Sequence, residues 1–107
     1  MKVTVNRQLN SGQYIVRFQV SDFSPEELAK MNSFGIPVIQ MVQLVQGGGR
    51  RTMALPINQI SSNIIASFGT EEEATKYQDT VLTQISQAMK TLRERKDNFT
   101  STQEVDI

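Results

Sequence analysis

A run of three glycines and two arginines, Gly47-Gly48-Gly49-Arg50-Arg51, has the clearest potential for chemistry in this sequence. Glycines let a backbone approach a phosphate closely, and neighbouring guanidinium groups supply paired donors for a phosphate or a carboxylate. The run lacks the Lys-Ser/Thr ending and the following helix of a phosphate-binding loop. Adjacent strand residues also point to opposite faces, so Arg50 and Arg51 are not expected to clamp one ligand. The simpler interpretation is a glycine hairpin with solvated charges, and contact with nucleic acid or an acidic partner is the alternative.

A second group of basic residues lies near the C-terminal end of the sequence and consists of Lys90, Arg93, Arg95 and Lys96. Basic side chains in the last turn of a helix stabilise the negative end of its dipole by a few tenths of a kcal/mol to about 1 kcal/mol each. Lys90 and Glu94 have the i,i+4 spacing of a helical ion pair. Arg93 and Asp97 have the same spacing. A structural role is therefore the simpler interpretation, and contact with nucleic acid or a membrane surface is the alternative.

Residues suited to catalysis or metal binding are scarce. The sequence contains no histidine, no cysteine and no tryptophan, so the commonest general base, the thiolate nucleophile and the best zinc ligands are missing. The consecutive carboxylates Glu71, Glu72 and Glu73 diverge by about 100° each on a helix and do not converge on one ion. The sequence predicts no enzyme, no cofactor and no metal site. An enzyme based on lysine or carboxylate chemistry is the remaining alternative.

Length and composition predict one domain. The 107 residues, of which 38% are hydrophobic and 21% charged, fall in the range of globular chains that bury a core. Basic and acidic residues number 11 each, which argues against a dedicated DNA-coating protein. We predict a single α+β domain over residues 1–99 and a disordered tail over residues 100–107. No stretch resembles a signal peptide or a membrane span, so we expect a cytoplasmic protein without membrane contact.

The glycine-arginine run is expected to join two strands. Residues 38–46 are short and rich in Val and Ile, which favours a strand over the helix that glutamines at every third position would allow. Apolar residues alternate again in residues 50–57, so a hairpin is predicted to close around the glycines. Pro56 donates no ladder hydrogen bond and places the second strand at a sheet edge, or ends it.

Three further strands are predicted. Residues 3–9 and 13–20 show the alternation of half-buried strands, and Asn10-Ser11-Gly12 between them is typical of a hairpin turn. A short fifth strand is expected where apolar residues alternate at Ile64, Ala66 and Phe68.

A short helix is predicted to begin at Ser24-Pro25-Glu26-Glu27. Ser24 fits the N-cap, proline fits the first helical position, and Glu27 completes a capping box. Leu28, Met31 and Phe34 are expected to be buried, and glycine followed by Ile-Pro ends the helix.

The last helix is predicted from Thr70 to about Asp97. Its apolar residues recur at intervals that average to the period of a straight helix and not to that of a coiled coil, so we expect it to lie on a sheet. Those residues are Ala74, Tyr77, Val81, Ile85, Ala88 and Leu92. Its length of roughly 40 Å exceeds the diameter of about 34 Å of a compact chain of this size. The helix is therefore predicted to overhang the body or to rest on a second subunit.

These observations predict an antiparallel sheet of four to five strands in the order ββαβββα, with both helices on one face. The favoured function is a small non-catalytic interaction or assembly module that forms a homodimer, through the long helix or an open sheet edge, and binds a protein partner. The alternative is nucleic-acid binding through the hairpin and the basic helix end. The candidate binding residues are Arg50, Arg51, Lys90, Arg93 and Lys96.

Overall fold

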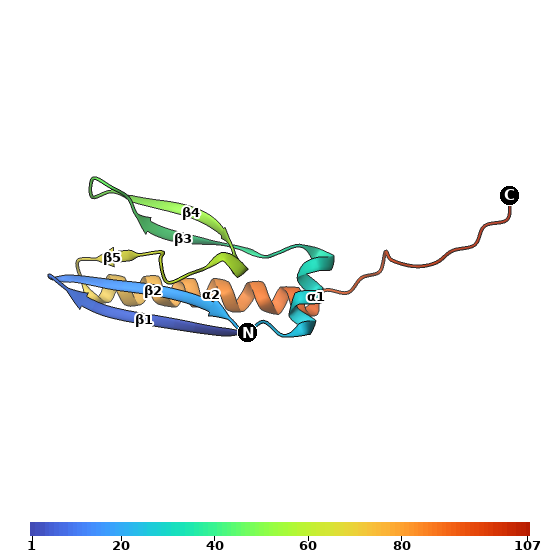
Figure 1. The fold of residues 1–107 in the computed structure, drawn as a ribbon, viewed down its shortest axis with the longest axis horizontal. Coiled ribbons are helices and arrows are strands. Elements are labelled where there is room, and N and C mark those ends of the chain that lie inside the picture. Colours follow the sequence, from blue (N-terminus) through green and yellow to red (C-terminus); the bar gives the residue numbers. More distant parts are fainter.

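The computed structural model describes residues 1–107 as an elongated molecule of five strands and two helices (Figure 1). Its principal extents are 72 × 25 × 19 Å, and the longest includes the chain after the last helix, which leads away from the body. The order of the elements confirms the predicted α+β class. They are β1 (Lys2–Asn10), β2 (Gln13–Ser21), α1 (Pro25–Phe34), β3 (Val38–Leu44), β4 (Arg50–Pro56), β5 (Ala66–Phe68) and α2 (Glu71–Glu94), with a 3₁₀ turn at Ile57–Gln59.

The hairpin of β1 and β2 is long and regular. Ser11 and Gly12, the two residues between the strands, have positive φ angles of 52° and 75°, which a type I′ turn requires. All nine residues of β1 pair with β2 in one continuous register. Directly opposite residues share a face of the sheet, so Val5 lies on the same face as its partner Phe18, which is buried in the core.

The strands divide between two antiparallel sheets, where the sequence predicts one. The first sheet has the order β1-β2-β5, and the second consists of β3 and β4. The sheets meet where the Leu44 N–H of β3 donates to the Ile65 carbonyl, just before β5, over 3.0 Å. Because β5 has only three residues, it cannot pair with β3 along its length. The last residue of β4 is Pro56, which confirms that this strand is an edge and ends there.

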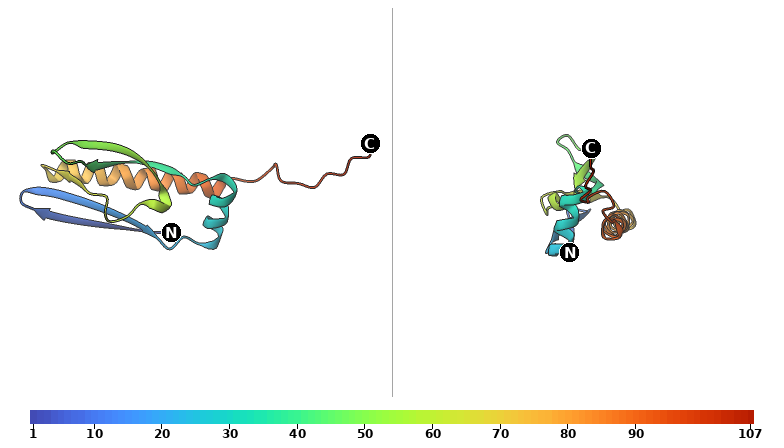
Figure 2. Two further views of the ribbon diagram at one scale, coloured as in Figure 1. Left: turned by 45° about the horizontal axis from the view of Figure 1, so that its top comes forward. Right: turned by 90° about the vertical axis from the view of Figure 1, so that its right-hand side faces the viewer.

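Helix α2 lies along the strands and buries one face over its whole length (Figure 2). The Thr70 side chain accepts a hydrogen bond from the Glu73 N–H over 3.2 Å and caps the first turn. The helix packs against β2, β3 and β5, as the apolar stripe predicts. The residues of α2 that are buried are Ala74, Val81, Ile85, Met89 and Leu92.

Helix α1 crosses the end of α2 and is not packed on the face of a sheet (Figures 1 and 2). The capping box is confirmed, since the Glu27 N–H donates to Ser24 Oγ over 3.1 Å and the Ser24 N–H donates to Glu27 Oε1 over 2.9 Å. Met31 is buried as predicted, but Leu28 is 50% exposed and Phe34 only half-buried. The prediction for Leu28 was wrong because α1 packs only against the end of α2. This contact covers less of the α1 surface than a sheet would cover, and Leu28 lies outside it.

The predicted overhang of α2 was wrong. The helix ends at Glu94, and Leu92 in its last turn is only 3% exposed. The body is elongated and not spherical: its strands of nine residues run for about 30 Å, and α1 covers the remaining turn of α2. The segment that projects from the body is therefore the chain after Arg95, and not the helix (Figure 1).

Candidate functional site

The structure places the two arginines of the predicted hairpin in different surroundings. The Arg50 guanidinium lies 4.6 Å from the ring centre of Phe68, at the end of β5. Arg51 pairs with Gln43 across the hairpin and is exposed. Neither residue forms an ion pair. Arg50 therefore packs on the core as a cation over an aromatic ring, and the two residues do not form a joint clamp.

The basic end of α2 is partly occupied by contacts within the protein. Arg93 Nη2 lies 3.0 Å from Glu27 Oε2, and the Arg95 guanidinium lies 5.3 Å from the ring centre of Phe34. The predicted i,i+4 ion pairs of Lys90 and Arg93 are not formed, and Arg93 pairs with Glu27 of α1 instead. Lys90 and Lys96 are exposed and without an ion pair.

The two basic groups lie towards opposite ends of the folded body (Figure 1). The hairpin tip lies over the first half of α2, where Tyr77 contacts Val42 of β3. The Arg93 group follows Tyr77 by 16 positions, or about 24 Å along the helix axis. The structure therefore does not bring the five predicted binding residues onto one surface.

Glu27 is the one buried carboxylate, and the sequence predicts only its capping role. Its Oε1 lies 3.0 Å from the Met1 amino group and accepts the Ser24 N–H, while its Oε2 accepts from Arg93. Burial alone raises the pKa of this carboxyl group, but the hydrogen bonds from Ser24, the Met1 amine and Arg93 outweigh it and lower the pKa to about 2. Glu27 is therefore ionised and fully engaged in joining α1 to the chain start and to α2.

Two polar side chains of α2 bind the backbone of β3 at the edge where the two sheets separate. The Tyr77 hydroxyl accepts from the Val42 N–H over 3.2 Å and donates to the Val42 carbonyl over 3.3 Å. The Gln84 side chain accepts from the Gln40 N–H over 3.0 Å and donates to the Gln40 carbonyl over 3.4 Å. Each side chain thus satisfies backbone groups of β3 that a neighbouring strand would otherwise pair with. Burial of the Tyr77 hydroxyl also raises its pKa.

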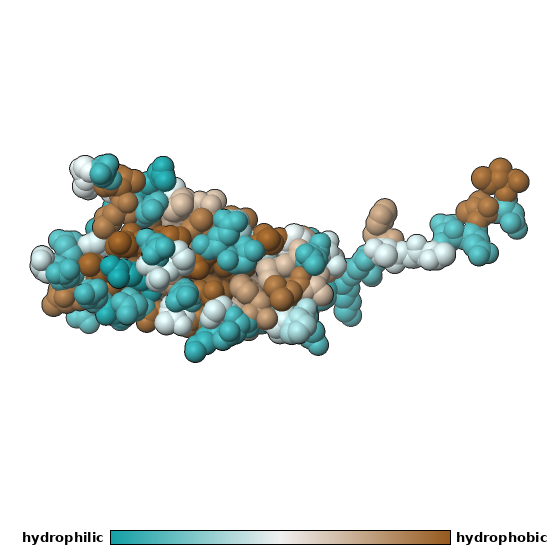
Figure 3. All heavy atoms as spheres, viewed as in Figure 1, coloured by the Kyte–Doolittle hydropathy of each residue, from teal (hydrophilic) through white to brown (hydrophobic).

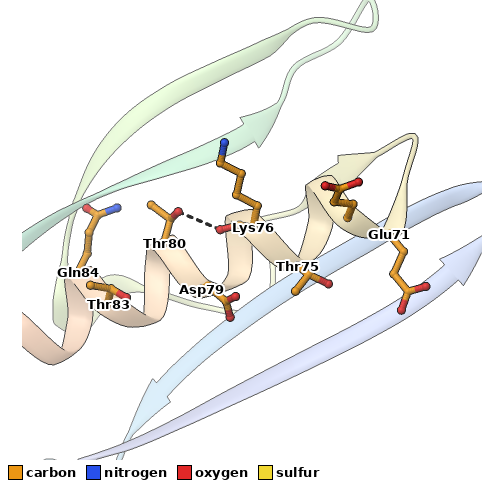
Figure 4. A pocket seen from close by; sticks show the side chains of 8 residues that line it. Glu71, Thr75, Lys76, Asp79, Thr80, Thr83 and Gln84 are labelled. Carbon is orange, nitrogen blue, oxygen red and sulfur yellow. Dashed lines mark hydrogen bonds between the residues drawn. The ribbon is translucent and has the colours of Figure 1, made fainter.

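The largest hollow on the surface, about 790 Å³, follows the polar face of α2 (Figure 4). All of its lining residues come from this one helix, and Gln84 at one end of them reaches β3. Acidic, basic and hydroxyl side chains alternate along it, and Thr80 Oγ1 is bonded to the Lys76 carbonyl of its own helix over 2.9 Å. No second element closes this hollow, so its side chains do not converge on a ligand (Figure 4).

A groove of about 540 Å³ lies between α2 and the segment that joins α1 to β3. The joining segment forms an apolar wall in which Ile36 is 42% and Val38 is 56% exposed. The facing wall on α2 carries Ala88 and Leu92 at its base and polar residues at its rim. The lining residues are Phe34, Gly35, Ile36, Pro37, Val38, Ile39, Gln84, Gln87, Ala88, Thr91, Leu92 and Arg95.

Exposed hydrophobic side chains elsewhere are more scattered. On the side shown in Figure 3, hydrophobic and hydrophilic atoms are mixed over the body, and further hydrophobic residues lie along the projecting chain. The groove combines two exposed aliphatic residues on either side of Pro37 in one wall with the partly buried Ala88 and the buried Leu92 at its base. It is therefore the site of this chain that best fits a ligand.

Comparison with protein-family models, with curated proteins and with solved structures gave no match for this chain. Neither helix combines the length and the apolar character that crossing a bilayer requires.

Proposed function

We propose that this protein is a non-catalytic interaction module that binds a segment of another protein in the groove between α2 and residues 34–39. The observation that carries the proposal is the exposure of Ile36 and Val38 on the wall of a 540 Å³ groove. Apolar walls with a few polar groups are typical of sites that bind a side chain and fix its orientation. The groove is a third candidate region beside the two basic groups, and the sequence does not single it out.

The lining of the groove defines the chemistry of its partner. The apolar wall and base accept an aliphatic or aromatic side chain, while Gln87 and Thr91 on the rim offer hydrogen bonds to a backbone. Arg95 lies at the end of the groove that is nearest the C-terminus of α2, and its guanidinium has no carboxylate partner. The partner segment therefore carries an apolar residue beside an acidic residue, which Arg95 pairs with.

The surroundings of the titratable groups support a non-catalytic role. Both oxygens of Glu27 are engaged with positive groups or N–H donors, and the Tyr77 hydroxyl is engaged with Val42. A catalytic acid or base must have access to a substrate proton. These two groups instead stabilise the packing of α1 and β3.

Nucleic-acid binding remains the alternative, and the positions of the basic residues weaken it. Arg93 is paired with Glu27, Arg50 packs on Phe68, and the two groups lie at opposite ends of α2. A continuous basic surface is the usual feature of a protein that follows a phosphate backbone.

A displayed library of random peptides tests the proposal. We expect selection on the wild-type protein to enrich peptides in which an apolar residue stands beside Asp or Glu. The affinity of these peptides, measured by fluorescence polarisation, should fall about tenfold or more in Val38→Lys, which places a charge on the apolar wall. Leu28→Lys is the matched control, because Leu28 is 50% exposed on α1 and does not line the groove.

Arg95→Gln separates the two parts of the predicted motif. It should remove the preference for the acidic residue while binding of the apolar residue persists. Failure to enrich any peptide, or equal affinity for wild type and Val38→Lys, contradicts the proposal. Salt-dependent binding of a DNA or RNA oligonucleotide that is lost when Arg50 and Arg51 are changed to Ala would favour the alternative.

A further inference from the structure

The outer edge of β1 is a long strand edge without a partner. β1 pairs with β2 on one side only, and its other side is the end of the three-stranded sheet. In an antiparallel pair, every second residue directs its N–H and C=O away from the partner strand. Over nine residues in one register, β1 thus offers a row of unpaired backbone groups. Such an edge is a template for adding another strand.

The edge strand β4 of the second sheet is protected in ways that β1 is not. β4 begins with two arginines and ends at Pro56, and charged residues and proline are devices that block strand addition. β1 contains no proline and no bulge. Its charged residues are Lys2 at its first position and Arg7, which is held by α2.

We propose that β1 pairs antiparallel with β1 of a second copy of this chain, about a two-fold axis that passes through Asn6. This register aligns the strand over its full length, because Lys2 then lies opposite Asn10 and Asn6 lies opposite itself. About a two-fold axis, both copies use the same surface for the contact. The result is a continuous sheet of two three-stranded sheets.

The side chains fit this register. Val3 of each copy lies opposite Leu9 of the other, and Leu9 is 62% exposed in the single chain. Both residues lie on the face of the sheet that α2 covers, since their partners on β2 are Val20 and Tyr14. Cross-strand apolar pairs of this kind contribute to sheet stability. The pairing thus covers apolar surface that the isolated chain leaves open.

The charges of β1 do not oppose the pairing. Arg7 lies opposite Val5 of the other copy and not opposite a second arginine. Its guanidinium donates to Thr75 Oγ1 over 3.0 Å and lies 4.0 Å from Glu71 Oε1, so it is directed towards its own helix. No two residues of like charge face each other in the paired strands.

The helices leave room for the second copy. In the paired sheet the two β2 strands are three strand spacings apart, or about 14 Å. Each α2 packs on β2, β3 and β5, so it lies on the far side of β2 from the new contact. The two α2 helices are therefore farther apart than the 8–10 Å at which helices touch. This pairing is independent of the groove, which lies between α2 and residues 34–39.

Disulfide trapping tests the register, because the natural chain has no cysteine. Asn6→Cys brings two thiols face to face across the axis, with Cβ atoms about 4.5–5.5 Å apart, close to disulfide geometry. Thr4→Cys is the matched control, since Thr4 is exposed on the same face but lies about 13 Å from its counterpart in this register. We expect oxidised glutathione to convert Asn6→Cys into covalent dimer roughly tenfold faster than Thr4→Cys.

Sedimentation equilibrium of the unmodified chain provides the second measurement. It should show a concentration-dependent dimer, and Val38→Lys in the groove should leave that dimer unchanged. A strict monomer at high protein concentration overturns the pairing whatever the cysteine variants do, including the case in which Asn6→Cys fails to fold. Equal cross-linking of Asn6→Cys and Thr4→Cys overturns the register. Failure of the wild-type protein to enrich any peptide, with an intact dimer, counts against the groove alone, so the two proposals fail separately.

Discussion

At the residue scale, Glu27 shows how one side chain acquires two roles. It completes the capping box of α1 through Ser24, and the same carboxylate receives the Arg93 guanidinium of α2 and the Met1 amine. Only the first role lies within three residues and is readable from the sequence. The ion pair with Arg93 spans 66 positions. In the sequence, Arg93 is only a basic residue near a helix end, with several acidic residues close enough to be its partner. The sequence therefore predicts a partner four residues away, which the structure does not use.

Acid titration tests the role of Glu27. Its pKa is lowered to about 2 in the folded protein from 4.5, so the charged form stabilises the fold above pH 4.5 and this contribution is lost as the pH falls towards 2. The contribution amounts to about 3 kcal/mol at neutral pH. We expect the free energy of unfolding, measured in urea at several pH values, to decrease by that order between pH 4.5 and 2.

Glu27→Gln should lower stability at neutral pH by about 2–3 kcal/mol, because it leaves Arg93 and the amine without their carboxylate. It should also remove most of the acid-dependent loss. Glu26→Gln, at an exposed neighbouring position, is the control and should change little. A Glu27→Gln variant with the same stability and the same pH profile as wild type would contradict this role.

At the element scale, the division of the strands into two sheets follows from contacts of α2. β5 is too short to pair with β3, and the side chains of Tyr77 and Gln84 satisfy the backbone of β3 instead. The two residues are seven positions apart and so lie on one side of the helix, two turns from each other. The sequence pattern does not mark Gln84 as a residue that binds a strand. Its target on β3 lies 44 positions away and is a backbone group, which side-chain patterns do not reveal.

Tyr77→Phe tests this replacement of a strand by a helix side chain. The variant keeps the aromatic contacts with Phe18 and Phe68 but leaves the Val42 N–H and carbonyl without a partner. We expect a loss of about 1–2 kcal/mol in stability and faster hydrogen exchange at the Val42 amide. Tyr14→Phe is the control, because its hydroxyl forms no hydrogen bond within the protein. An unchanged exchange rate at Val42 would show that Tyr77 does not protect β3.

At the scale of the whole molecule, local patterns predict the elements and long-range contacts decide their arrangement. The capping box of α1, the Ser11–Gly12 turn and the order of the elements along the chain are confirmed. The overhang of α2 was wrong because the body is elongated, with α1 placed across its end. The groove also lies outside what the sequence predicts, since its two walls come from residues 34–39 and 84–95 and meet only in the fold.

The most direct test of the account is to map peptide binding by backbone amide chemical shifts in the ¹⁵N-labelled protein. The peptide is one selected from the library, with an apolar residue beside an acidic one. The account predicts that the largest shifts fall on residues 34–39 and on the Gln87, Thr91 and Arg95 side of α2. Largest shifts at Arg50 and Arg51 or along β1, with the groove unaffected, would contradict it.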